Sequence, residues 1–225
     1  MSANCVLPSQ EMSQTFIRNL TFQTDDLGRE STLLLTFDSY TEGIYDKFYP
    51  VVWRVSPFGK RGSYSMVATY TSQLAFLKPQ VVEGNITEAS TCIEINYGQA
   101  TTLTEAHDVF HFSDPVPGIN GCVRAWNNTG VAQDIAVGFM SPGKLMPKPV
   151  LHFSGVEHRG KVTAQFTPIL RAYITSDYEE NTILRGAIDT PCLWKQDLAA
   201  LHEENTTWNL TRNPSTGHYE ITRAY

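Results

Sequence analysis

Apolar and polar side chains alternate with a period of two along almost the whole chain of 225 residues. Successive side chains of a β-strand point to opposite faces, so this period predicts strands with one apolar and one polar face. Clusters of Gly, Pro, Asn and Asp separate the runs, as turns do. Many short strands at this spacing predict an all-β fold, an antiparallel sandwich or barrel. The clearest runs are 33–37, 51–55, 64–70, 93–97, 109–112, 135–139, 162–166 and 170–174.

Local signals near the C-terminus add two elements to this fold. Residues 213–217 predict the turn of a β-hairpin, because a proline presets φ there and Gly217 supplies a positive φ. One short helix is predicted from Pro191 to Glu204, with Thr190 as its N-cap and proline at its first position. Its apolar residues repeat at four and three positions, which suits one helix face. They are Trp194, Leu198 and Leu201. A shorter helical turn is predicted near residues 41–47.

The chain is predicted to be a single β domain over residues 1–225. No linker-like segment interrupts it, and a chain of this length can bury a sizeable core without disulfide or metal support. Residues 1–14 are predicted to be a flexible N-terminus.

Charge and composition limit the classes of partner that can be expected. The formal net charge is −6, only 18% of residues are charged, and no basic stripe occurs. Nucleic acid and anionic membranes are therefore not expected as partners. The N-terminus lacks the basic and apolar regions of a signal peptide, and no apolar run is long enough to span a membrane, which predicts a cytoplasmic protein. Five N-glycosylation sequons favour secretion, but a chain rich in Asn and Thr also produces them by chance. They begin at Asn19, Asn85, Asn127, Asn205 and Asn209.

The four cysteines have wide, irregular spacing. No Cys-x-x-Cys pair occurs, which disfavours a zinc ribbon or a thioredoxin-like site. In a reducing compartment these residues are free thiols. Cys92 and Cys122 fall in strand patterns and are expected to be small core residues.

His107 and His111, with Glu105 nearby, are the most suggestive titratable group. Residues four apart share one face of a strand, and two imidazoles with a carboxylate can hold a first-row metal. In a regular strand their Cα atoms lie about 13 Å apart, too far for one ion. No metal site is therefore predicted unless the strand bulges there.

Other polar pairs remain open to two interpretations. His152 and His158 approach each other if the segment between them is a hairpin, or they are surface histidines. Asp134 and Arg124 interrupt apolar strands, so they form one buried ion pair or face water.

No nucleophile elbow, phosphate-binding loop, dinucleotide fingerprint or metalloprotease motif is present, which lowers the expectation of a common enzyme class.

Aromatic residues make up 11% of the chain. They form either an ordinary core or the walls of a cavity, and aromatic walls with a few polar groups suit a planar organic ligand. The candidate wall residues are Trp53, Tyr64, Tyr70, Phe76, Tyr97, Phe110, Phe112 and Trp126.

Several segments resemble a largely uncharacterised family of basidiomycete fungal β-proteins. They are Tyr70–Phe76, Gly98–Glu105, Phe112–Pro115, Gln133–Phe139 and Gln196–Leu201. The resemblance extends to fungal chromoproteins, and it implies an organic chromophore held within the fold that gives colour and no catalysis. No chromophore contact can be transferred by motif. Nucleophilic or hydrogen-bonding side chains among aromatics are the candidates to attach or tune a pigment, namely Cys92, Cys122, His111 and Tyr97.

The leading functional hypothesis is a protein that binds a small aromatic molecule, a pigment in the family interpretation. A cytosolic sugar-binding or defence lectin is the first alternative, with the loop from Trp126 to Gly130 stacking on a sugar. An enzyme of small-molecule metabolism centred on Glu105, His107 and His111 is the second. Association into a homo-oligomer stays open. The predicted ligand-binding residues are Trp53, Tyr70, Cys92, Tyr97, Phe110, His111, Cys122 and Trp126.

Overall fold

The computed structural model describes residues 15–37 and 44–224, and within them the chain forms 18 strands and no helix. The predicted flexible segment 1–14 lies outside these residues. The strands are β1 (Ile17–Thr24), β2 (Ser31–Thr36), β3 (Tyr49–Pro50), β4 (Val52–Phe58), β5 (Tyr64–Thr71), β6 (Leu74–Val82), β7 (Asn85–Ile95), β8 (Gln99–Ala106), β9 (Val109–Phe112), β10 (Val116–Pro117), β11 (Val123–Asn127), β12 (Gln133–Phe139), β13 (Lys148–Val156), β14 (Lys161–Ala164), β15 (Ile169–Ile174), β16 (Trp194–Asp197), β17 (Asn205–Arg212) and β18 (Tyr219–Arg223).

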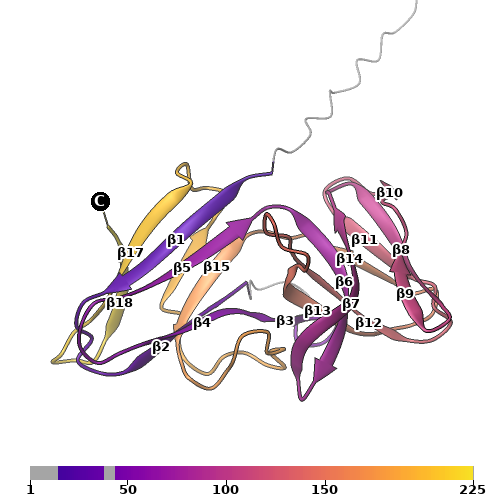
Figure 1. The fold of residues 1–225 in the computed structure, drawn as a ribbon. Coiled ribbons are helices and arrows are strands. Elements are labelled where there is room, and N and C mark those ends of the chain that lie inside the picture. The colour runs from indigo at the N-terminus through magenta and orange to yellow at the C-terminus, as the bar shows by residue number, and fades with distance from the viewer. Residues whose placement is uncertain (1–14, 38–43, 225) are drawn as a thin grey trace, which may run out of the picture.

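The described strands form four sheets. Sheet 1 has the order β18-β17-β1-β5, sheet 2 the order β16-β15-β2-β4, and sheet 3 the order β3-β13-β12-β6-β7. Sheet 4 has the order β10-β8-β11-β14, with β9 paired to β8. Sheets 1 and 2 lie in one half of the molecule and sheets 3 and 4 in the other (Figure 1). The segment β6 to β14, inserted between β5 and β15, thus builds the second half together with β3.

Aromatic contacts join the two sheets of each pair. In the first pair the Trp194 ring of sheet 2 lies 5.4 Å from Phe22 and 4.8 Å from Trp208, both in sheet 1. In the second pair Phe76 of sheet 3 lies 6.4 Å from Phe112 of sheet 4. The all-β prediction is confirmed, and the described sheets form packed pairs and no closed barrel.

Five aromatic residues connect the two halves, and we call them the aromatic junction. Phe37 is its centre, with ring centroids 5.1 Å from Trp53, 5.2 Å from Phe139, 5.4 Å from Phe166 and 6.0 Å from Tyr70. Tyr70, Trp53 and Phe139 lie in strands of sheets 1, 2 and 3, and Phe166 lies in the connection that follows β14 of sheet 4. One hydrophobic cluster consequently contains residues from every sheet.

The connection between β15 and β16, residues 175–193, contains no strand, and part of it covers the outer faces of sheets 2 and 3. The Asn181 and Ile183 N–H groups donate to the carbonyls of Val52 and Gly84, and the Leu184 N–H donates to Pro50. Ile183 packs in one small apolar cluster on sheet 3 and Leu184 in another on sheet 2. This cover is why Leu34 is buried although it faces away from Leu33 and Leu35.

The predicted helix from Pro191 to Glu204 is wrong. Trp194–Asp197 is the strand β16, which pairs antiparallel with β15. A spacing of four residues fits a period of two as well as a helical turn. Trp194 in β16 and Leu198 in the bend after it both reach the core without a helix. Of the shorter helical turn predicted near residues 41–47, 45–47 form a turn and 41–43 lie outside the described residues.

Two strand pairs depart from the antiparallel prediction. β1 pairs parallel with β17, and β11 pairs parallel with β8. The C-terminal hairpin is confirmed, because β17 and β18 pair antiparallel. Gly217 has φ 74° and donates its N–H to the Asn213 carbonyl, which closes the turn.

The sequons at Asn19, Asn205 and Asn209 fall in β1 and β17, on the outer face of sheet 1. An Asn-x-Thr triplet places Asn and Thr on one face of a strand, so a polar strand face produces sequons by alternation alone. The Asn19 amide donates to the Asn205 side chain at 3.0 Å, and Gln23 donates to Asn209 at 2.8 Å. These asparagines thus have a structural role as an amide ladder between parallel strands.

No helix among residues 15–37 and 44–224 is long and apolar enough to cross a membrane.

Candidate functional site

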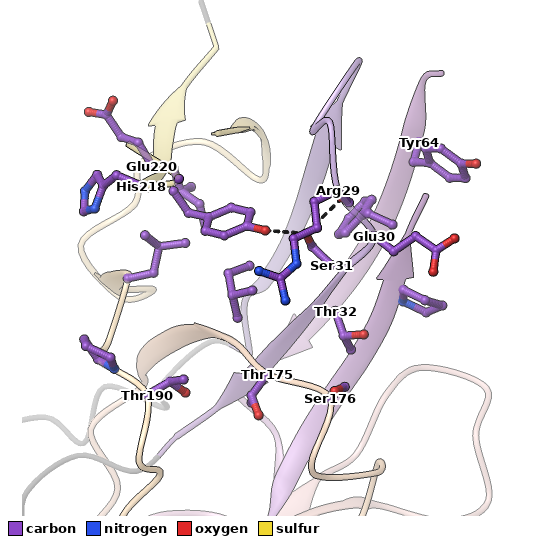
Figure 2. A pocket seen from close by; sticks show the side chains of 18 of the residues that line it. Arg29, Glu30, Ser31, Thr32, Tyr64, Thr175, Ser176, Thr190, His218 and Glu220 are labelled. Carbon is purple, nitrogen blue, oxygen red and sulfur yellow. Dashed lines mark hydrogen bonds between the residues drawn. The ribbon is translucent and has the colours of Figure 1, made fainter. Parts of the chain in front are cut away.

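A pocket opens at one end of the first sheet pair, and we call it the end pocket (Figure 2). It has a volume of about 1190 Å³ and is open to solvent on one side. It lies where β18, the edge strand of sheet 1, faces β2 and the end of β15 in sheet 2. Its lining residues are 29–32, 57–59, 64, 174–176, 190–193 and 217–221.

A hydrogen bond between two hydroxyls links the sheets inside the end pocket. Ser31 Oγ lies 2.6 Å from the Tyr219 phenol oxygen, and it also donates to the Arg29 carbonyl at 3.2 Å. Because a serine has one hydroxyl proton, Tyr219 must be the donor to Ser31. The two side chains therefore close the wall between β2 and β18 with satisfied polar groups.

Charged and polar side chains share this pocket with apolar ones. The Arg29 guanidinium is directed into the pocket, whereas Glu30 and Glu220 point away from it on opposite sides (Figure 2). Arg29 forms no ion pair within the part of the chain that the structure describes. The Thr190 hydroxyl is buried there and has no hydrogen-bond partner. Apolar lining comes from Pro57, Phe58, Ile174, Pro191, Leu193 and Ile221.

Cys192 lines the end pocket with an exposed thiol, whereas Cys122 is buried at 9% exposure. We expect iodoacetamide to modify Cys192 at least roughly tenfold faster than Cys122, because burial withholds a thiol from solvent and reagent. Cys92 is intermediate in exposure, and burial raises its pKa, so it should react at an intermediate rate. Peptide mapping by mass spectrometry at timed quenches measures all three rates. Equal rates for Cys192 and Cys122 would show that the pocket wall is covered.

None of the eight predicted ligand-binding residues lines the end pocket. Trp53 and Tyr70 belong to the aromatic junction, at 1% and 3% exposure. Burial raises the pKa of the Tyr70 phenol far above its ordinary value. These two rings pack against other rings and leave no described cavity between them.

Tyr97, Cys92 and Cys122 lie in or near the second half of the molecule. Tyr97 is 41% exposed and donates to the Phe166 carbonyl at 2.8 Å, and burial of part of its ring raises its pKa. The Cys92 thiol donates weakly to the Leu145 carbonyl, and the Cys122 thiol donates to Ile119. Each has its own local contact, so they do not form one site.

Phe110, His111 and Trp126 lie in sheet 4. The ammonium of Lys78 is 5.0 Å from the centre of the Phe110 ring. Trp126 is 37% exposed, and its ring has the Arg124 and Lys161 cations at 5.8 and 5.3 Å. The indole is thus already engaged by cations.

The loop after Trp126, proposed to contact a sugar, is held by Asn127. This side chain is fully buried and donates to the carbonyls of Val131 and Val156, both at 2.7 Å. It also accepts hydrogen bonds from Thr129. Asn127 is therefore occupied in shaping its own loop.

The side chains of Glu105, His107 and His111 do not meet at one site. In the β8–β9 register His111 is opposite Thr104, and Glu105 is opposite Phe110. Glu105 and His111 consequently leave opposite faces of this hairpin. His107 lies in the connecting turn with φ 52°. No cluster of three metal-ligating side chains occurs among the described residues.

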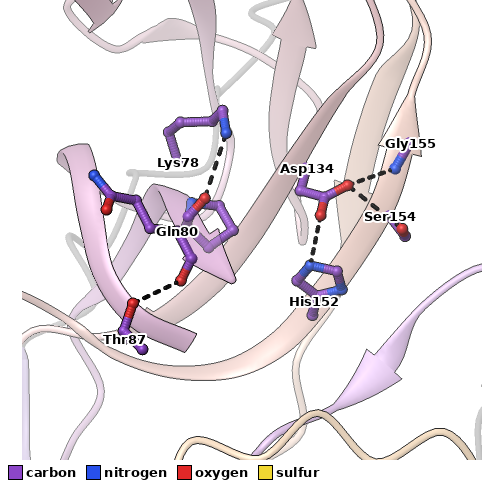
Figure 3. Close-up of polar contacts among 8 residues, drawn as sticks. Lys78, Gln80, Thr87, Asp134, His152, Ser154 and Gly155 are labelled. Atoms are coloured by element: carbon purple, nitrogen blue, oxygen red, sulfur yellow. Dashed lines mark hydrogen bonds and ion pairs between the residues drawn. The ribbon is translucent and has the colours of Figure 1, made fainter. Parts of the chain in front are cut away.

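Asp134 pairs with His152 and not with Arg124, which rules out the buried ion pair, one of the two alternatives for these residues (Figure 3). His152 is fully buried, and its Nε2 lies 3.2 Å from Asp134 Oδ2. Asp134 Oδ1 accepts the Gly155 N–H at 2.8 Å. Arg124 instead donates to the Thr163 hydroxyl, and His158 accepts the Gly130 N–H.

The hydrogen bond from His152 lowers the pKa of Asp134 from 3.8 to about 2. A carboxyl whose pKa is depressed in the folded state stabilises the fold above its unfolded pKa and loses that contribution as pH falls. We expect Asp134→Asn to cost on the order of 1–2 kcal/mol at pH 7, discounted for partial exposure. This difference from the parent should shrink between about pH 4 and pH 2.

Urea unfolding at several pH values measures this effect. Asp189→Asn is the matched control, because Asp189 is exposed and makes no described hydrogen bond. A cost of Asp134→Asn that stays constant down to pH 2 contradicts the assigned pairing.

Of the residues that line the end pocket, Tyr64 is among the aromatic wall residues that the sequence suggested, and the polar residues were missed. Arg29, Ser31, Thr190 and Tyr219 stand far apart in the chain, and no spacing rule relates them. Thr190 was interpreted as a helix cap, and Arg29 stands in a turn without any motif. Only the pairing of β2 with β15 and the position of β18 at a sheet edge bring them together.

Comparison of the chain with protein-family models, curated proteins and solved structures found no match in any of the three. The resemblance to basidiomycete fungal proteins therefore stays a prediction from the sequence.

Proposed function

We propose that this protein binds a small, partly apolar organic molecule in the end pocket. The observation that carries the proposal is a pocket of about 1190 Å³ that combines apolar walls with the guanidinium of Arg29. Binding sites for small molecules typically pair apolar lining with a few polar groups that orient the ligand. The volume includes an open side, so a ligand of ordinary size fills only part of it.

The predicted aromatic cavity receives less support as the binding site. The rings of the aromatic junction contact one another, and the junction residues Trp53, Tyr70 and Phe139 are at most 3% exposed. Such a cluster is what an ordinary close-packed core looks like. The end pocket therefore replaces this cluster as the proposed site for an aromatic ligand.

A pigment is the ligand that the resemblance to fungal chromoproteins implies. Visible absorbance of the purified protein, with mass spectrometry of an organic extract, tests this part of the proposal. An absorption band lost on extraction supports a chromoprotein. A colourless protein without a co-purifying molecule contradicts the pigment, and the binding test below then decides on the pocket alone.

Filling the end pocket tests the site. Ser176 is exposed and lines the pocket, so Ser176→Trp places an indole there at little cost to folding. Ser65→Trp is the control, because Ser65 is exposed on β5 and does not line the pocket. We expect the first variant to weaken binding of N-phenyl-1-naphthylamine, a neutral fluorescent aromatic probe, and the second to leave it unchanged. Equal affinity in both variants overturns the assignment of the site.

A further inference from the structure

We infer that the ligand of the end pocket is an organic anion, whose carboxylate or sulfonate pairs with Arg29 while its apolar body lies against the sheets. This inference rests on the proposed function, since it names the chemical class that the same pocket selects. It depends on the position of the Arg29 guanidinium, on the groups around it, and on the absence of an ion-pair partner for it among the described residues.

The chain around Arg29 is anchored at both sides. Gly28 donates its N–H to the Lys60 carbonyl at 3.0 Å, and the Arg29 carbonyl accepts from Ser31 at 3.2 Å. Ser31 is in turn held by Tyr219 across the pocket. These contacts hold the backbone of an exposed arginine in place, so that its side chain starts from a defined point on the pocket wall.

The guanidinium itself has no counter-ion in the part of the chain that is described. Figure 2 shows it directed toward the side of the pocket where Thr175 and Thr190 lie. Thr175 already donates to Asp177 at 3.0 Å, and the Thr190 hydroxyl oxygen is buried from solvent, so neither hydroxyl competes for the guanidinium. A planar donor with five N–H groups matches a carboxylate or sulfonate edge.

Two carboxylates near the pocket limit the affinity of this site for an anion. Glu30 and Glu220 are both exposed, and neither lies within ion-pair distance of Arg29. Charges in contact with solvent are screened, so they weaken the attraction of an anion without removing the direct contact. The anion must therefore reach the guanidinium itself, and an apolar body against Phe58, Leu193 and Ile221 supplies the remaining affinity.

Two probes with the same rings separate the anion from the apolar body. They are 8-anilinonaphthalene-1-sulfonate and the neutral N-phenyl-1-naphthylamine, and their dissociation constants are measured by fluorescence titration. We expect Arg29→Gln to weaken binding of the sulfonate roughly tenfold and of the neutral probe less than about twofold. Arg29→Lys, which keeps the charge, should recover part of the loss.

Arg159→Gln is the matched control, because Arg159 is an exposed arginine in the turn between β13 and β14. Circular dichroism confirms that each variant is folded. If both probes bind, Ser176→Trp weakens both, and Arg29→Gln acts no more on the sulfonate than Arg159→Gln does, the anion inference is overturned while the proposed function stands. If neither probe responds to Ser176→Trp, the proposed function itself fails and this inference with it.

Discussion

Replacing Phe37 with alanine should lower the free energy of unfolding by about 3–5 kcal/mol. Phe37 is 2% exposed and contacts four other aromatic rings. Removing its ring leaves a cavity bounded by rings from both halves of the molecule, which cannot close without moving both halves. Edge-to-face contacts between the rings add to the loss from area alone.

Phe48→Ala is the control for this substitution. Phe48 is half-buried and, among residues 15–37 and 44–224, has one ring contact, at 5.6 Å to Phe153. We expect this change to cost less than half as much as Phe37→Ala in urea unfolding monitored by fluorescence and circular dichroism. Costs of equal size would mean that the aromatic junction has no special part in holding the halves together.

Replacing His152 with alanine should cost about 2–4 kcal/mol. The imidazole is fully buried on sheet 3, in register with Ala136 and Tyr49. Its loss leaves a void beside the Tyr49 ring and removes the hydrogen bond that stabilises the Asp134 carboxylate. A partly buried carboxylate that loses its partner adds a desolvation cost to the cost of the cavity.

His152→Gln separates these two costs, because a glutamine amide can donate from a place close to that of Nε2. We expect it to recover at least half of the loss in the free energy of unfolding. His202→Ala is the surface control and should change stability by less than about 0.5 kcal/mol. If His152→Ala lowers the free energy of unfolding no more than His202→Ala does, neither the contact with Asp134 nor the burial of the ring stabilises the fold.

The fold class was predictable because side-chain alternation is a local property of a strand. Leu33 and Leu35 point into the main core as their spacing requires, and the turn ending at Gly217 forms as its residues dictate. The pairing of strands was not predictable in the same way. β1 and β17 are adjacent and parallel although more than 180 residues separate them, and no local pattern encodes that contact.

The helix error and the missed pocket have related causes. Trp194 and Leu198 fit two periods equally, and only the free edge of β15 favoured extended chain for this segment. Arg29 and Thr190 acquire a shared environment through long-range packing. Their residue types carry no catalytic signature, so only the fold brings them together at one pocket.

The most direct measurement of the binding proposal is a ¹H–¹⁵N correlation spectrum of the protein titrated with 8-anilinonaphthalene-1-sulfonate. The end pocket predicts that the shifted backbone amides cluster at Ser31, Thr175, Cys192 and Tyr219, on the segments that line it. Shifts confined to Tyr97, Phe110 and Trp126 would return the site to the residues first predicted from the sequence. Such a result, or no saturable shift at all, would contradict a ligand site between sheets 1 and 2.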